Sequence, residues 1–243
     1  MSKAIQHVLS EPSPSAPRPV AFSVLRVPFF LEPHYDENKP FIESNRERLI
    51  KKWGGIKGWN EQKRRHDLKG RGLEAGIPHF NLDRLAANSM ASHRLIQMLG
   101  KRYGLRVSEA VYDTLNVYYF VDGHSLNDRL RLAETVADKL RELLDEPPSA
   151  DEILEFLNGD DGRKEIEEAL IMLNRLGVHG IPKFLIEGHT MVDGAAHSDV
   201  FIEVFRDIEA RGKLRGQPLF ADILGVSPEV VAEGSHRAED IAA

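Results

Sequence analysis

The chain has 243 residues, of which 42% are hydrophobic and 29% are charged, proportions that are ordinary for a water-soluble globular protein. Its formal net charge of −6 argues against general nucleic-acid binding, and no apolar run approaches the roughly 20 residues that span a bilayer. The sequence contains no cysteine, which excludes a disulfide, a thiolate metal site and a thiol nucleophile among these residues.

The N-terminal segment is rich in serine and proline. Because each X-Pro step disfavours helix, residues 1–19 are predicted to form an extended or disordered leader. Residues 21–31 follow as a β-branched and aromatic run bounded by prolines, which predicts a strand. The start of the chain lacks the long apolar core of a secretory signal, and with the absence of cysteine this predicts a cytoplasmic protein.

From Pro40 onward the pattern of apolar residues becomes helical. Asn81 is predicted to cap a strong helix that reaches Leu99, and Ser149 with Glu152 three residues later is the signature of a capping box. Further helices are predicted over 41–53, within the basic stretch 56–77, and over 108–119, 125–144, 149–158 and 162–176.

Two short strands, 183–186 and 190–192, and a helix over 198–211 are predicted to close the fold. The tail 212–243 has weak signals and is expected to be partly irregular. The order of elements predicts an α/β fold with three parts: the leader 1–19, a domain over 20–211 with a large helical insertion at about 40–176, and the tail.

Five short motifs occur in a fixed order over most of the chain. They are Pro28-Phe29-Phe30-Leu31, Asn88 to Leu95, Tyr118 to Gly123, Gly177 to Phe184 and Gly194-Ala195-Ala196. Together they resemble the motifs of the DsbA-like family, specifically its branch with FrnE-like oxidoreductases and 2-hydroxychromene-2-carboxylate isomerases. The resemblance implies a thioredoxin-like fold interrupted by a large helical insertion.

The same resemblance implies a function and a site. Members catalyse thiol–disulfide oxidoreduction or glutathione-dependent isomerisation, and a loop with a cis-proline holds the thiol substrate by its backbone. In this chain that loop is Gly180-Ile181-Pro182, and the N–H and C=O of Ile181 would pair with a bound peptide or glutathione like an added strand. The helix motif adds Asn88, His93 and Arg94 as substrate-binding candidates; for His93 and Arg94 a packing or surface role is the competing interpretation.

The chain also departs from the family pattern. Family members begin with a strand, a Cys-x-x-Cys or serine-containing motif, and a first helix, whose N-terminus lowers the pKa of the nucleophile. Only the serine- and proline-rich leader precedes residue 20, so this N-terminal βα unit is predicted to be missing and no catalytic residue is assigned. Ala196 also replaces the glutamine that ends the family's Gly-Ala-Gln motif.

Two other groups of residues invite a functional interpretation. His179, His189 and His197 lie near the proline loop, but their spacing fits no familiar zinc site, so no metal site is predicted. The basic stretch 51–71 holds eight cations around Trp53 and Trp59, a combination that could stack single-stranded nucleic acid; a solvated helix and loop is the simpler interpretation.

The sequence therefore predicts a DsbA-like protein without dithiol redox activity that binds a thiol peptide or a glutathione-like molecule. No cofactor is required, glutathione is the one candidate, and neither nucleic acid nor a membrane is expected as a partner. Two alternatives stay open. The first is a non-catalytic interaction protein that uses a sheet edge uncovered by the missing strand, which includes a homodimer. The second is a truncated form of an active oxidoreductase.

Overall fold

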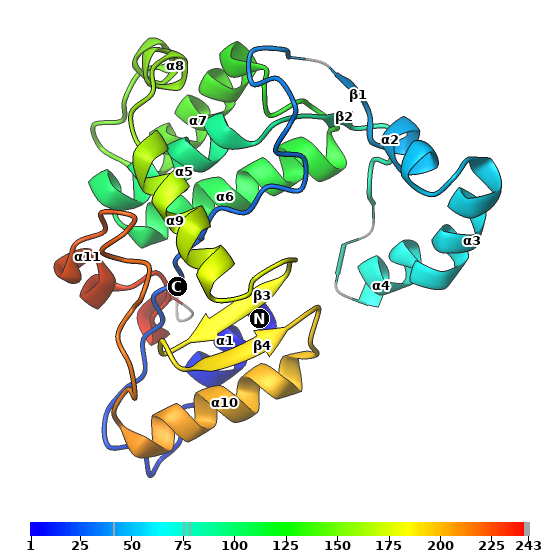
Figure 1. Cartoon of the computed structure of the whole chain (residues 1–243). Helices are drawn as coiled ribbons and strands as arrows, with labels where there is room; N and C mark the ends of the chain where they lie inside the picture. The colour runs from blue at the N-terminus through cyan, green and yellow to red at the C-terminus, as the bar shows by residue number, and fades with distance from the viewer. Residues whose placement is uncertain (41, 75, 78, 241–243) are drawn as a thin grey trace. The chain divides into compact units, whose positions relative to one another are not determined.

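The structure is a computed structural model that describes residues 1–40, 42–74, 76–77 and 79–240 (Figure 1). The chain forms two compact units. Unit 1 comprises Met1–Phe29, Ile96–Glu109 and Gly162–Ala243, and unit 2 comprises Phe30–Leu95 and Ala110–Asp161. Helices α5 (Met90–Tyr103) and α6 (Leu105–Asn116) contribute residues to both units.

Unit 1 is built around a β-hairpin. Strand β3 (Lys183–Ile186) pairs antiparallel with β4 (Thr190–Asp193), with Phe184 opposite Val192. The connecting turn places Glu187 and Gly188 at positive φ. These are the two strands that the sequence predicts near 183–186 and 190–192. The unit also contains α1 (Ser2–Ser10), α9 (Arg163–Arg175), α10 (Ser198–Arg211), α11 (Pro228–Glu233) and the short η2 (Ala238–Asp240).

Among the described residues, two of the clusters of buried apolar side chains belong to unit 1. The first, the α10 cluster, is built from α1, β4 and α10 and contains Ala4, Ile5, Val8, Leu9, Val192, Phe201 and Phe205. The second, the α9 cluster, is built from α9 and the C-terminal segment and contains Leu105, Ala169, Leu173, Val178, Phe220, Ala221, Leu224 and Val226. Because successive strand residues point to opposite faces, Phe184 and Ile186 pack against the α10 cluster while Leu185 packs against the α9 cluster.

The prediction that residues 1–19 form an extended or disordered leader is wrong for Ser2–Ser10. Ser2–Ser10 form helix α1, which packs against α10 and buries its apolar side chains; Ile5 is 2% exposed and Val8 is 1% exposed. The prolines that suggested an extended segment all lie after this helix. A helix therefore precedes residue 20, and the missing N-terminal βα unit stays a prediction.

The predicted strand over 21–31 is extended but pairs at a single point. Phe22 forms an isolated antiparallel bridge with His236, and its backbone N–H donates to the His236 carbonyl at 2.9 Å. The partner belongs to the tail 212–243, which is less irregular than predicted. The tail contains α11 and η2, and it buries Phe220 and Leu224 in the α9 cluster.

Unit 2 is mainly helical. Its elements are β1 (Glu43–Ser44), α2 (Asn45–Lys52), α3 (Ile56–His66), α4 (Leu68–Glu74), β2 (Leu85–Ala86), η1 (Val117–Val121), α7 (Arg129–Leu143) and α8 (Ala150–Asn158). The predicted helix over 41–53 is realised as α2; Phe41 lies outside the described residues. The capping box at Ser149 and Glu152 is confirmed at the start of α8.

The predicted and observed helix boundaries differ most at the helix that was expected to begin at Asn81. Residues 85–86 instead form strand β2, which pairs with β1, and the helix α5 begins only at Met90. The Asn81 carboxamide accepts a hydrogen bond from the Asp83 N–H, so its capping chemistry stabilises a local turn. The domain boundaries also differ from the predicted insertion at 40–176, because residues 96–109 and 162–176 belong to unit 1.

Candidate functional site

The six predicted site residues fall into two groups. Gly180, Ile181 and Pro182 belong to unit 1, and Asn88, His93 and Arg94 belong to unit 2.

The proline loop leads directly into strand β3. The Ile181–Pro182 peptide bond is cis, and the Pro182 carbonyl accepts a hydrogen bond from the Gly194 N–H at 2.9 Å, which joins the loop to the end of β4. The Ile181 side chain is 51% exposed. A Cβ placed on Gly180 would meet no atom within 4 Å, so the loop borders open space on that side.

The backbone of Ile181 lies just before the paired part of β3. The Pro182 carbonyl accepts from the Gly194 N–H, one residue before the register in which Lys183 lies opposite Asp193. Within the part of the chain that the structure describes, neither the N–H nor the C=O of Ile181 has a hydrogen-bond partner. This residue therefore offers one donor and one acceptor to a ligand with an extended backbone.

A buried ion pair holds the turn that follows β3. The Glu187 side chain is 1% exposed and accepts hydrogen bonds from the Arg211 guanidinium at 2.9 and 3.0 Å and from the Arg215 N–H at 2.8 Å. Burial raises the pKa of Glu187, but the hydrogen bonds from Arg215 and Arg211 outweigh burial and hold the pKa below its ordinary value of 4.5. The sequence did not point to this pair, because its members lie 24 positions apart and belong to no motif.

Replacing Glu187 by glutamine is expected to destabilise the protein by about 2 kcal/mol near pH 7, since two charge-assisted interactions are lost. The carboxylate has a lower pKa when folded than when unfolded, so its contribution is present above about pH 4.5 and is lost as pH falls through the folded pKa. The free energies of unfolding of the native protein and of Glu187→Gln, measured in urea, should therefore converge as the pH is lowered. Exposed Glu203→Gln on α10 is the control, and a difference that stays constant with pH would contradict this assignment.

Asn88 is a structural residue at the start of α5. Its side-chain oxygen accepts the N–H of Met90 at 2.8 Å, and its amide nitrogen donates to the Tyr35 carbonyl at 2.9 Å. The residue is 4% exposed. Both ends of the carboxamide thus hold the protein backbone, which gives Asn88 a structural role at the start of α5, while its ligand contact stays a prediction.

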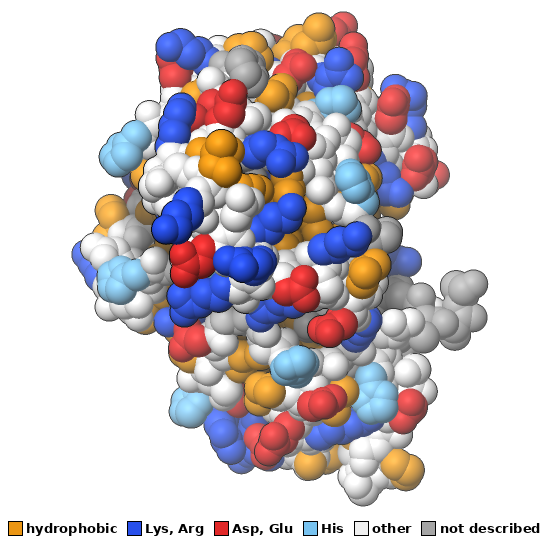
Figure 2. All heavy atoms as spheres, turned by 90° about the vertical axis from the view of Figure 1, so that its right-hand side faces the viewer, with side chains coloured by type: hydrophobic (Ala, Val, Ile, Leu, Met, Phe, Trp, Pro, Cys, Tyr) orange, Lys and Arg blue, Asp and Glu red, His pale blue; other side chains and the backbone are white. Residues whose placement is uncertain are grey.

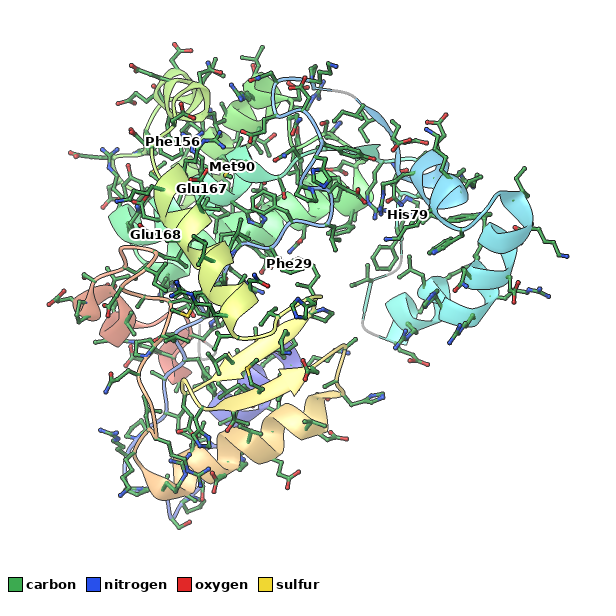
Figure 3. All side chains as sticks on the ribbon, in the orientation of Figure 1. Phe29, His79, Met90, Phe156, Glu167 and Glu168 are labelled. Atoms are coloured by element: carbon green, nitrogen blue, oxygen red, sulfur yellow. The ribbon has the colours of Figure 1, made fainter. Side chains whose placement is uncertain are left out.

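Arg94 is the largest fully buried side chain, at 1% exposure. Its guanidinium donates to the carbonyls of Phe156 at 2.9 Å, Leu157 at 3.4 Å and Asp161 at 2.7 Å, and it lies over the Phe156 ring at 5.0 Å. Figure 3 labels Phe156 near the end of α8 and Met90 at the start of α5. The last carbonyls of a helix have no intrahelical partner and favour a cation, so Arg94 caps α8 and has a structural role.

His93 is the remaining candidate in unit 2. Its side chain is half-buried, and its ring contacts that of Phe30 edge to face, with centroids 5.2 Å apart. Phe30 belongs to the Pro-Phe-Phe-Leu motif, so two of the motifs found in the sequence meet at this contact. Ligand binding by His93 stays a prediction.

The histidines near the proline loop and the basic stretch 51–71 are the two other groups that the sequence singles out. Among the residues that the structure describes, no set of three or more histidines and carboxylates is arranged to hold a metal ion. In the basic stretch, Trp59 is 7% exposed and its ring stacks on that of Trp53 at 5.6 Å, so its face is covered by protein. Figure 2 shows basic and acidic side chains interspersed over the viewed face. None of the described helices has the length and apolar character that crossing a membrane requires.

Comparison with known proteins supports the fold. A scan against protein-family models and a search of curated proteins found no match. Among solved structures, the chain is similar to the crystal structure of a probable DsbA oxidoreductase from Streptomyces coelicolor, with 22% sequence identity and a TM-score of 0.67 over 88% of this chain and 85% of that chain. The chain therefore has a DsbA-like thioredoxin fold with a helical insertion, as the sequence predicts.

Proposed function

We propose that this protein binds the backbone of a thiol-containing peptide, or of glutathione, at the Gly180-Ile181-Pro182 loop. The ligand would extend along the loop and exchange hydrogen bonds with the N–H and C=O of Ile181. We further propose that the protein acts in the cytoplasm and needs no cofactor besides this ligand. The similar fold of a probable DsbA oxidoreductase supports thiol chemistry as the context of this binding.

The observation that carries the proposal is the pair of unpartnered backbone groups at an exposed loop. Because Ile181 is exposed, a ligand can replace water at its backbone donor and acceptor. Ile181 combines these groups with a side chain that is 51% exposed, and Gly180 leaves the space beside it open. The cysteinyl residue of γ-glutamyl-cysteinyl-glycine carries one N–H and one C=O, the pair of groups that a residue of an added strand would exchange with Ile181.

This proposal separates binding from catalysis. The sequence supplies no cysteine, so these residues cannot carry out dithiol exchange by themselves. A bound thiol would be held by the protein backbone, and any reaction would depend on the thiol of the ligand. The proposed activity is thus recognition of a thiol compound without turnover by a protein thiol.

Two matched variants of Ile181 test the proposal by NMR titration with reduced glutathione. Ile181→Ala keeps the backbone N–H and should retain saturable chemical-shift changes in the loop at about millimolar ligand. Ile181→Pro removes that N–H and should weaken binding about tenfold, because one hydrogen bond is lost. Unchanged signals from β3 and β4 show that the hairpin is folded. No shifts in the native protein, or equal affinity in both variants, would overturn the proposal.

A further inference from the structure

The basic side chains of helices α2, α3 and α4 differ in whether a carboxylate neutralises them. On α2, three of them form ion pairs with carboxylates, which are Arg46–Asp83, Arg48–Glu32 and Lys51–Glu43. Among the residues that the structure describes, none of the basic side chains of α3 and α4 forms such a pair, and all of them are exposed: Lys57, Lys63, Arg64, Arg65, Lys69 and Arg71. We call these six side chains the basic surface.

The acidic side chains of the same segment do not neutralise the basic surface. Residues 56–74 hold six basic and three acidic side chains, a net charge of +3 within a chain whose total is −6. One of the three, Asp67, follows α3, and its carboxylate accepts the Gly70 N–H at 3.2 Å, so it stabilises the start of α4. The negative total charge of the chain therefore conceals a local excess of positive charge.

Aromatic stacking holds α3 on one of its sides. Trp59 is 7% exposed and its ring stacks on that of Trp53, which ends α2. The His66 ring, at the other end of α3, also stacks on Trp53, with centroids 6.2 Å apart. Trp59 is therefore covered by protein, and the stack keeps the opposite side of α3 toward solvent.

Large aliphatic side chains are exposed beside the basic surface. Ile56 is 67% exposed, and Leu68 and Leu73 on α4 are 45% and 56% exposed. Ile56 is separated from Lys63 and Arg64 by seven and eight residues, about two helical turns, so the three lie on the same side of α3. Figure 2 faces the side of the molecule on which α2, α3 and α4 lie in Figure 1, and it shows hydrophobic side chains between basic ones. The exposed part of these helices thus combines basic and aliphatic side chains.

Three kinds of polyanion would neutralise the basic surface: single-stranded nucleic acid, an acidic protein segment and an anionic lipid bilayer. Single-stranded nucleic acid is bound in large part through stacking of its bases on aromatic faces, and the covered Trp59 offers none. Aliphatic side chains gain free energy on leaving water, and a bilayer has an apolar boundary directly beneath its headgroups. A lipid surface therefore matches the basic and the aliphatic side chains together, which favours it over the other two.

We propose that the basic surface binds the face of a bilayer that contains anionic lipids. The six basic side chains contact the headgroups, and Ile56, Leu68 and Leu73 enter the boundary between headgroups and acyl chains. The sequence predicts no membrane partner because no apolar run spans a bilayer, and binding at the surface does not require one. Carboxylates elsewhere in the chain oppose this contact little, since charges more than about 10 Å away are screened at about 0.1 M salt. The basic surface belongs to unit 2 and Ile181 to unit 1, so the proposal does not depend on thiol binding.

Co-sedimentation of the full chain with lipid vesicles tests the proposal. Vesicles of phosphatidylserine and phosphatidylcholine in equal parts should bind the protein at least about tenfold more tightly than vesicles of phosphatidylcholine alone. Raising the salt to about 1 M, where the screening length is about 3 Å, should weaken this binding at least about tenfold. No binding to the phosphatidylserine vesicles, or equal binding to both kinds of vesicle, would refute the proposal.

Charge reversal locates the contact on the protein. A triple variant should bind the phosphatidylserine vesicles at least about tenfold more weakly; it combines Lys57→Glu, Lys63→Glu and Arg64→Glu. The matched control makes the same change in net charge at three exposed residues of unit 1 and should keep the binding; it combines Lys164→Glu, Arg175→Glu and Lys213→Glu. Equal losses in the two variants would show that binding follows the total charge of the chain, contrary to the proposal.

A single substitution keeps the proposal testable even if the triple variant fails to fold. Ile56→Ser removes an exposed aliphatic side chain from α3 and should weaken binding to the phosphatidylserine vesicles about threefold. Leu130→Ser removes a 58% exposed leucine from α7 and should leave the binding unchanged. Polyglutamate and an oligothymidylate are the competing polyanions. Binding to either of them at least as tightly as to the vesicles, with Ile56→Ser unaffected, would assign the basic surface to a protein or nucleic-acid partner and overturn the lipid proposal.

Discussion

Replacing Arg94 by methionine is expected to lower the free energy of unfolding by about 4 kcal/mol, as measured by urea denaturation. Methionine retains much of the apolar volume but none of the donors. The carbonyls of Leu157 and Asp161 would then lose the guanidinium, and the Phe156 carbonyl would keep the Gly159 N–H but lose its second donor. A buried acceptor that loses its partner costs about 1–3 kcal/mol, which makes the sum large.

Two further variants decide whether this loss comes from capping. Arg94→Lys keeps the charge but cannot direct donors to three carbonyls in a planar fork, so it should recover only part of the stability. Arg102→Met on the same helix removes an exposed arginine and should cost less than about 0.5 kcal/mol. A loss below about 1 kcal/mol for Arg94→Met would show that the carbonyls do not depend on the guanidinium. If Arg94→Met lowers the stability as expected, hydrogen exchange should locate the weakened region at the end of α8.

Replacing Ile5 by alanine is expected to cost about 3 kcal/mol, because the side chain is 2% exposed and lies in the α10 cluster with Phe201 and Phe205. Removing buried methyl and methylene groups loses their transfer free energy and leaves a cavity that the surroundings fill only in part. A disordered leader would show no such effect. Urea denaturation therefore distinguishes a structural α1 from an extended segment.

The matched control for Ile5→Ala is Gln6→Ala, one position further along the same helix and exposed to solvent. Because alanine has a higher helix propensity than glutamine, this variant should be neutral or slightly stabilising. If both variants leave the stability unchanged, α1 does not pack against α10 in solution. If both destabilise equally, the effect belongs to helix formation and not to burial.

Local chemistry made parts of this fold predictable. The capping box predicts the start of α8 because Ser149 and Glu152 lie within four residues of each other. The glycines and apolar runs around 183–192 predict the hairpin because they too are close together in the sequence. The helix expected from Asn81 failed because Leu85 and Ala86 pair with residues 43–44 in a ladder, a contact that no local pattern announces. The prediction also missed α1, although Ala4, Ile5, Val8 and Leu9 recur at helical spacing, because it extended the effect of the prolines after residue 10 over the whole segment.

By itself the sequence predicted the DsbA-like fold and the proline loop and showed that these 243 residues contain no cysteine, because each of these depends on residue identity and short spacing. Only the tertiary structure decided which protein groups the helix motif contacts. The Asn88 carboxamide holds the Tyr35 carbonyl and the Met90 N–H, and the Arg94 guanidinium holds carbonyls at and just beyond the end of α8. These contacts join segments that are far apart in the sequence, so no local pattern could predict them.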